Sequence, residues 1–560
     1  MDTAAHSHPR RDLGMVILVT CLVFLPGLAG SFVWDDAMLV LENRLTASPQ
    51  FGRVAWWQAL FTTDLWATAP KSVGPTGYYR PLFLLGLALD GALFADSPML
   101  HRAHSLAWHL LAVGLFWRLL VGLAFSRFAT LVGVAWFALH PLQTESVLFV
   151  SARNDVMATA LLLGCMVWLL VRRERWRAVD LMGSGLCLVA ACLAKESALV
   201  APVLWAVIAW TCGGTQLLKR VQPWLSLASG LLLEGVVRWL SGVAMPDSTW
   251  PPFELVGKAA AWSARAVVWP FNLSPAVHLA WVDPHPWWAL GVVCLGMVGL
   301  TVWRRGMAAP LLFALLAWAP TLVAVEQTRL VSLRYLTMPL VGVAMALALA
   351  VHIGTKTART WHRRAALGWT TLLAVACALA VPMWHDDVSL WTAVEQRTPS
   401  RYATGALAKV WDDLGDLDKA AQLYEEAAVG PLPFWEACYN VSDVHLRRGD
   451  AAAAVQAGER ALSEGCRPTP ELVAPTALAH ALTGNWPRAE ALALQVDQDP
   501  TGKAVVVRTA ASVRSGDLSA FADMSSDDAV GLGNRVVWLL QETGETDAAR
   551  PLQEMITTKR

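Results

Sequence analysis

The stretch SFVWDDAMLVLENRL, residues 31–45, follows directly on an apolar run, residues 13–30. A transmembrane helix needs about 20 predominantly apolar residues, so this run is long enough to enter a bilayer. Asp35 and Asp36 then lie where the helix would leave the hydrocarbon. Ionisable groups at membrane depth are costly and mark functional sites by default. The stretch therefore predicts a membrane protein with a polar site at one face of the bilayer.

The composition supports this interpretation and divides the chain in two. Of 560 residues, 55% are hydrophobic and only 16% are charged, and the mean hydropathy is +0.43. A soluble domain has about a quarter of its residues charged. Residues 1–383 contain repeated apolar runs, whereas residues 384–560 read as a polar helical domain. The formal net charge is zero, so nothing indicates binding to nucleic acid.

We expect an all-α fold with about eleven transmembrane helices, followed by a soluble helical solenoid. Basic residues in short loops set the orientation of such helices. Every strongly basic loop falls on the same side, which we therefore assign to the cytoplasm together with the N-terminus. The predicted spans lie near residues 13–30, 102–123, 128–142, 157–171, 180–194, 197–212, 222–242, 287–303, 309–325, 337–352 and 366–383.

The opposite, outer face then holds a first loop, residues 31–101, and the whole C-terminal domain. Residues 256–272 are too polar for an easy span, and we expect an interfacial or re-entrant helix there. The remaining outer segments are residues 141–156, 195–196, 243–286 and 326–336.

The C-terminal domain contains a repeat. Its aligned glycines are spaced 34, 35, 32 and 28 residues apart, and a small or apolar residue stands five positions beyond each one. A unit of about 34 residues with a helix–turn–helix pattern is typical of tetratricopeptide repeats, which stack into a surface suited to holding a peptide or protein. A generic helical array is the alternative. The glycines are Gly415, Gly449, Gly484, Gly516 and Gly544, and the following residues are Ala420, Ala454, Ala489, Phe521 and Ala549.

Polar clusters gather on the predicted outer face: WDD (34–36), YYRP (78–81), HPLQTESVLFVSARND (140–155), AKES (194–197) and LRYLTMP (333–339). Each cluster could instead have a purely structural role. An aspartate can cap a helix, His140 can end one, and Lys195-Glu196 or Arg334-Tyr335 can anchor a helix end at the membrane interface. Together they suit sugar transfer, in which a carboxylate base activates a hydroxyl and Arg or Lys binds the phosphate that leaves.

The cysteines predict no metal site. Most lie in apolar runs without metal-ligand spacing, and we expect inert packing. Cys438 and Cys466 fall in the polar domain, where the sequence leaves open whether they pair. Whether a divalent metal takes part is also left open, since no His, Cys or carboxylate cluster has convincing ligand spacing.

The motifs, taken in order, resemble those of a known family. FVWDD with LEN, YYRPL, HPLQTESV with SARND, LAKES, WPFNLS and LRYLTMPLVG, followed by repeats, are similar to the transmembrane and tetratricopeptide-repeat O-mannosyltransferases. These belong to the GT-C class of glycosyltransferases that use polyprenyl-phosphate sugars. The likeness covers nearly the whole chain.

The resemblance implies roles for individual residues. It implies that Asp35 or Asp36 is the catalytic base of an inverting transfer to a hydroxyl, and that Arg80, Lys195 and Arg334 lie near the donor phosphate. Tyr335 then supports the phosphate pocket. The repeats on the same outer face favour a protein Ser or Thr as the acceptor, with a glycan or lipid hydroxyl as the alternative. The residues expected to shape the site are His140, Glu145, Arg153, Asp155 and Glu196.

The sequence departs from the family pattern at three positions. Gln143 stands for a second histidine, Asn154 for a basic residue, and Leu333 for an acidic residue before Arg334. The residues expected to act as the base and to bind the phosphate are still present. The three departures therefore leave open which sugar is transferred.

Two other functions fit parts of the sequence. An oligosaccharide ligase also uses polyprenyl-linked donors, but its large outer loop usually comes late in the membrane domain. A non-catalytic scaffold could gather partners through its repeats, but it leaves WDD and the outer basic residues without a role. The expected partners are thus a polyprenyl-phosphate sugar, a protein or peptide acceptor and the lipid bilayer. We expect a bacterial inner membrane with periplasmic repeats, or the endoplasmic reticulum in a eukaryote.

Overall fold

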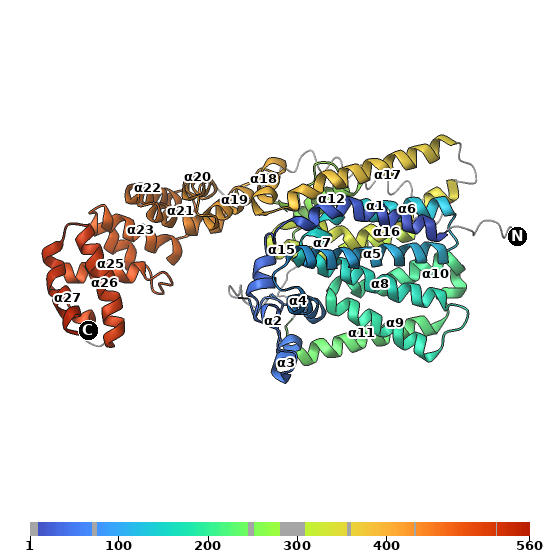
Figure 1. The fold of residues 1–560 in the computed structure, drawn as a ribbon, viewed down its shortest axis with the longest axis horizontal. Coiled ribbons are helices and arrows are strands. Elements are labelled where there is room, and N and C mark those ends of the chain that lie inside the picture. The colour runs from blue at the N-terminus through green and yellow to red at the C-terminus, as the bar shows by residue number, and fades with distance from the viewer. Residues whose placement is uncertain are drawn as a thin grey trace. The chain divides into compact units, whose positions relative to one another are not determined.

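The computed structural model describes residues 9–69, 76–244, 251–280, 308–354, 360–430, 433–521 and 524–559. The chain divides into two compact units, Met1–Arg397 and Thr398–Arg560. Both are built almost entirely from helices, which confirms the predicted all-α class (Figure 1).

The helices of the first unit follow the apolar runs of the sequence. Ten of the eleven predicted spans fall within the described residues, and each coincides with a helix or a pair of consecutive helices. The predicted span 287–303 lies outside the described residues. These elements are α1 (Pro9–Phe24), η2 (Leu25–Ala29), α5 (Pro98–Gly122), α6 (Arg127–Leu139), α8 (Arg153–Val171), α9 (Ala178–Ala194), η5 (Glu196–Val200), α10 (Ala201–Leu218), α11 (Val221–Ser241), α14 (Ala308–Trp318), α15 (Thr321–Thr328), α16 (Thr337–Gly354), α17 (Thr360–Ala380) and η7 (Val381–Trp384).

Six helical segments among the described residues are long and apolar enough to cross a membrane. Four shorter apolar helices accompany them, including α4 (Pro81–Phe94), which lies within the predicted first outer loop. Helix α11 coincides with a predicted span but carries Glu234 and Arg238 on its buried face, and it is not among the six. The chain is a multi-pass integral membrane protein.

The membrane helices pack around a common apolar core. Helices α5 and α8 lie side by side, as do α8 and α9 (Figure 1). The core buries large side chains such as Phe116 on α5, Phe137 on α6 and Trp205 on α10. The outward sides of α1 and α11 expose leucines, for example Leu18 and Leu232. Such helices suit a bilayer, where lipid replaces water around the apolar surface.

Short elements connect the membrane helices at the end where the predicted polar clusters gather. The two strands pair antiparallel, with Val277 opposite Val331, and so join the segment after α12 to the segment before Arg334. The sequence predicted an interfacial or re-entrant helix over residues 256–272, and the structure has a helix, α12, over most of this range. The elements are η3 (Ala37–Glu42), α2 (Arg44–Ala47), α3 (Val54–Thr62), α7 (Gln143–Leu148), η4 (Val150–Ala152), α12 (Phe253–Val268), β1 (Ala276–His278), β2 (Leu330–Ser332), η6 (Leu333–Leu336) and α18 (Asp387–Arg397).

The second unit consists of consecutive helices with the predicted repeat. Each of the five aligned glycines follows a helix and has a left-handed φ between 79° and 85°, a conformation that favours glycine. The five residues expected where paired helices meet are all buried. The helices are α19 (Arg401–Asp413), α20 (Leu417–Ala427), α21 (Trp435–Arg447), α22 (Ala451–Ser463), α23 (Pro470–Leu482), α24 (Trp486–Ala493), α25 (Lys503–Arg514), η8 (Ser519–Phe521), α26 (Ser526–Glu542) and α27 (Thr546–Lys559).

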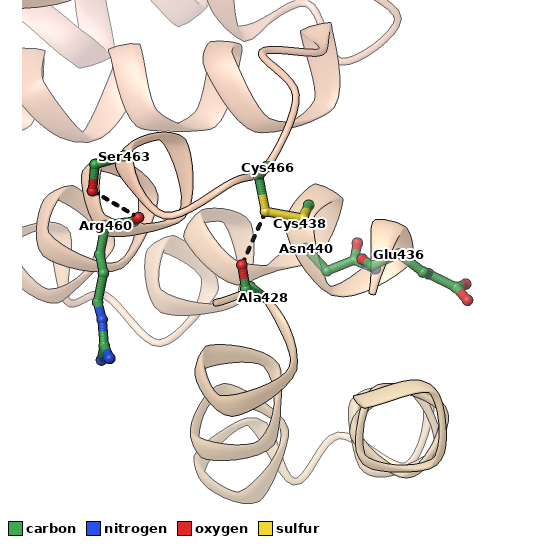
Figure 2. The surroundings of a disulfide bond; sticks show 7 residues. All are labelled: Ala428, Glu436, Cys438, Asn440, Arg460, Ser463 and Cys466. Atoms are coloured by element: carbon green, nitrogen blue, oxygen red, sulfur yellow. Dashed lines mark hydrogen bonds between the residues drawn. A yellow bond between two sulfur atoms is a disulfide. The ribbon is translucent and has the colours of Figure 1, made fainter. Parts of the chain in front are cut away.

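The pairing of Cys438 and Cys466, which the sequence left open, is settled by the structure. The two residues form a disulfide that joins α21 to the connection after α22 (Figure 2). Cys466 Sγ also lies 3.1 Å from the carbonyl oxygen of Ala428. The bond thus fixes neighbouring helices of the second unit to one another.

Candidate active site

Asp36 ties the first outer segment to the segment that precedes α8. Its Oδ1 accepts hydrogen bonds from the backbone N–H and the hydroxyl of Ser151, both at 2.7 Å. Its Oδ2 accepts from the backbone N–H groups of Val33 and Val150, both at 3.3 Å. The side chain is fully buried. Every acceptor direction of this carboxylate is therefore used within the fold.

Asp35 has different surroundings. It is half-buried, and no described residue donates a hydrogen bond to its carboxylate. Burial raises the pKa of Asp35 to about 6, the Arg334 guanidinium opposes that shift, and the Asp36 and Asp387 carboxylates add to it. A carboxyl group with a pKa near neutrality can accept a proton and release it again, which is the requirement for a general base.

Arg334 lies beside these aspartates in a setting of aromatic rings. Its backbone N–H donates to Glu145 Oε2 at 3.1 Å, and its Nε lies 3.5 Å from Glu145 Oε1. Its guanidinium carbon lies 5.5 Å from the ring centre of Trp34, 5.2 Å from that of Phe149 and 5.6 Å from that of Tyr335. These contacts hold the cation by an ion pair and by cation–π attraction.

Two further basic residues come from distant parts of the chain. Lys195 forms an ion pair with Asp155, and its ammonium lies 5.5 Å from the ring centre of Tyr335. Arg80 Nε donates to Glu196 Oε2 at 3.0 Å.

The three cations act on one another. Burial lowers the pKa of Lys195 to about 8; Asp155 opposes this, and Arg80 and Arg334 lower it further. The cations predicted from three separate motifs thus lie within electrostatic reach of one another, and each has a carboxylate partner.

Glu145 completes this arrangement. It is fully buried, and burial raises its pKa to about 7, whereas Arg334 lowers it. Predicted residues Arg80, Lys195, Arg334, Tyr335, Glu145, Asp155 and Glu196 are therefore all brought into one network.

Two predicted residues lie in interior packing instead. Arg153 is buried, with Nη1 2.5 Å from Asp90 Oδ2 and Nε 2.9 Å from Ser105 Oγ. His140 Nε2 lies 3.2 Å from the carbonyl oxygen of Val267. Their contacts fix α4, α5 and α12 around the site. Within the described residues, no three His, Cys, Asp or Glu side chains are arranged to hold a metal ion.

Residues that no sequence motif predicted also contact the site. The Trp34 N–H donates to Asp387 Oδ1 at 2.7 Å. The Trp34 ring stacks on Phe149 with 5.3 Å between ring centres, and it packs against Trp391 in a T-shaped arrangement with 5.2 Å between ring centres. One signal was available: HDD, residues 385–387, directly follows the last apolar run, just as WDD follows the first.

Comparisons with known proteins agree with the motifs. The chain is similar to proteins named protein O-mannosyl-transferase. It is 33% identical to Tmtc2 of Drosophila melanogaster over 201 residues, 33% of this chain and 20% of that protein. It is 27% identical to human TMTC2 over 185 residues, 31% of this chain and 21% of the relative. For TMTC1 of Mus musculus the identity is 28% over 169 residues, 30% of this chain and 17% of the relative.

These matches confirm the resemblance predicted from the motifs over about a third of the chain, whereas the motifs predicted a likeness over nearly all of it. The aligned part spans about a fifth of the length of each relative. No protein-family model matches the chain, and no solved structure is significantly similar to it.

Proposed function

We propose that this protein is an inverting glycosyltransferase that moves a sugar from a polyprenyl-phosphate donor to the hydroxyl of a protein Ser or Thr. The observation that carries the proposal is one carboxylate, Asp35, that is half-buried and receives no hydrogen bond from the described residues. It lies within electrostatic reach of Arg334, which belongs with Lys195 and Arg80 to one group of cations. The names of the relatives describe the same class of reaction, and they make mannose the first sugar to test.

The proposed reaction uses each group once. Asp35 takes the proton of the acceptor hydroxyl as its oxygen attacks the anomeric carbon of the donor sugar. The bond between that carbon and the phosphate oxygen breaks, and the lipid phosphate leaves with the electron pair from the opposite side. Because attack and departure take place on opposite faces, the configuration inverts. Arg334, Lys195 and Arg80 stabilise the phosphate charge that develops.

Two observations support an outer-face location for the site and the repeats. The strongly basic loops of the sequence share the other side, as the positive-inside tendency requires. The second unit contains a disulfide, and disulfides persist in the periplasm, the endoplasmic reticulum lumen or the cell exterior rather than in the cytosol. In this proposal, the repeats bind the acceptor polypeptide.

The test is sugar transfer by the full-length protein in liposomes, supplied with a panel of radiolabelled polyprenyl-phosphate sugars and Ser/Thr-containing polypeptides. Labelled protein, released as a sugar by β-elimination, is the expected result. An oligosaccharide ligase would instead transfer only preassembled glycans. A protein that binds polypeptides but transfers none of the sugars would overturn the proposal in favour of a scaffold.

A further inference from the structure

Helix α18 links the membrane helices to the repeats, and it contacts the candidate site. It begins directly after the last membrane segment and belongs to the first unit. Its first residue, Asp387, accepts the backbone N–H of Trp34 at 2.7 Å. Just before the helix, the carbonyl of His385 accepts the N–H of Ser31 at 2.7 Å. Residues 385–397, which we call the connector, therefore hold the start of the first outer segment at two points.

Trp34 adopts a backbone conformation that needs such support. Its φ of +55° lies in the left-handed region, which is uncommon for residues other than glycine. Such conformations persist where the surroundings over-determine them, and they cluster at functional sites. The Asp387 hydrogen bond fixes the Trp34 amide, and the rings of Phe149 and Trp391 fix its side chain.

We infer that Asp387 is a positioning residue for the transfer reaction: by holding the Trp34 amide it fixes the backbone that directs the Asp35 carboxylate. This inference rests on the proposed function. It also gives the connector a second role, because the chain segment that leads to the repeats is part of what orients the base. Asp387 touches neither reactant; it acts through Trp34.

The charge of Asp387 adds an electrostatic consequence. The charged groups that act on Asp35 are Arg334, which lowers its pKa, and Asp36 and Asp387, which raise it. An amide at position 387 keeps an oxygen that can accept the Trp34 N–H but removes the negative charge. Asp387→Asn therefore separates the two effects, whereas Asp387→Ala removes both.

A neighbouring residue offers a matched control. Asp386 caps α18 by accepting the N–H of Ser389 at 2.7 Å. Asn serves at helix N-caps about as well as Asp, so Asp386→Asn keeps the helix start while changing an adjacent carboxylate in the same way.

The first measurement is hydrogen–deuterium exchange of the full-length protein in detergent, followed in peptides that cover residues 31–45. We expect the Trp34 amide to exchange on the order of tenfold faster or more in Asp387→Ala, because a charge-assisted hydrogen bond is lost. Wild type, Asp387→Asn and Asp386→Asn should keep the slow exchange. If the Trp34 amide exchanges at the same rate in Asp387→Ala as in wild type, the inference is overturned.

The second measurement is transfer activity of the same variants. We expect kcat of Asp387→Ala to fall on the order of tenfold with the donor KM unchanged, and Asp387→Asn to keep most of its kcat while its acidic limb moves to lower pH. If wild type is active and neither variant differs from it in kcat or in pH profile, the inference fails alone. If wild type and Asp386→Asn transfer nothing, the proposed function fails first. Should Asp387→Ala not fold, Asp387→Ser takes its place in both measurements, because serine suits a helix start but lacks the carboxylate that accepts the Trp34 N–H.

Discussion

At the scale of single residues, two adjacent aspartates have opposite surroundings. Neighbouring side chains in a chain do not face the same way, so one can be taken up by the fold while the other stays available. The Asp36 carboxylate accepts four hydrogen bonds, whereas none of the described residues donates one to the Asp35 carboxylate. The sequence left open which of the two is the base, and these contacts favour Asp35.

The pKa of Asp35 predicts a pH dependence. A general base must be deprotonated to act, and burial raises the pKa of this carboxyl to about 6. Transfer should therefore be largely lost as the pH falls from about 7 to about 5, with half of the acidic loss near pH 6. Initial rates across this range give the profile, and circular dichroism shows whether the protein stays folded. A rate that is constant down to pH 5 would contradict the assignment.

Asp36 should matter for stability. In Asp36→Asn, the oxygen can still accept from Ser151, but the new NH₂ group faces the N–H donors of Val33 and Val150. We expect a loss of about 1 to 3 kcal/mol in the free energy of unfolding, because buried donors lose their acceptor. Thermal unfolding in detergent, with Asp35→Asn as the matched control, measures it; equal stability of the two variants would argue against the structural role.

At the scale of elements, Arg102 on α5 holds three separate segments together. Its buried guanidinium donates to the carbonyls of Gly27, Ser31 and Trp384. These carbonyls lie in η2, at the start of the first outer segment and at the end of η7. A lysine has one ammonium in place of the planar fork and cannot reach all three. Arg102→Lys should destabilise the protein by about 2 kcal/mol or more. Thermal unfolding checks this, and an unchanged melting temperature would contradict it.

The disulfide gives a second prediction for the elements. Cross-linking residues 28 apart restricts the unfolded chain, which corresponds to about 3 to 4 kcal/mol of stability. The Cys438→Ala/Cys466→Ala double variant should lower the unfolding temperature of the repeats. Limited proteolysis of the full chain at increasing temperature measures this change. Cys377→Ala, which removes a free cysteine in α17, serves as the comparison. Equal proteolysis of both variants would show that the bond contributes little.

Helices were easier to predict than contacts. Long apolar runs and the glycine period carry their information locally, so the spans and repeats could be located from the sequence. Helix α4 was missed because it is short for a span and contains Asp90. The role of Asp387 was missed because its partner, Trp34, lies 353 positions away. Pairing across such a distance depends on the packing of the intervening helices, which no local pattern encodes.

At the scale of the whole molecule, the chain combines a multi-pass membrane unit with a helical repeat unit. The first unit contains every predicted site residue and also α18, which the sequence had placed at the start of the repeat domain. In the proposed function, the first unit supplies the base and the phosphate-binding cations, and the second binds the acceptor. The connector then serves catalysis as well as linking the two units, since Asp387 holds the segment that carries Asp35.

The most direct test of this account compares Asp35→Asn with Asp36→Asn in liposomes supplied with the polyprenyl-phosphate sugar that wild type uses best. Loss of a general base typically lowers the rate by about 10² to 10⁴-fold. We expect Asp35→Asn to fold like wild type and to lose transfer by that factor, while folded Asp36→Asn retains a larger share of activity. Wild-type rates in a folded Asp35→Asn protein would contradict the central claim.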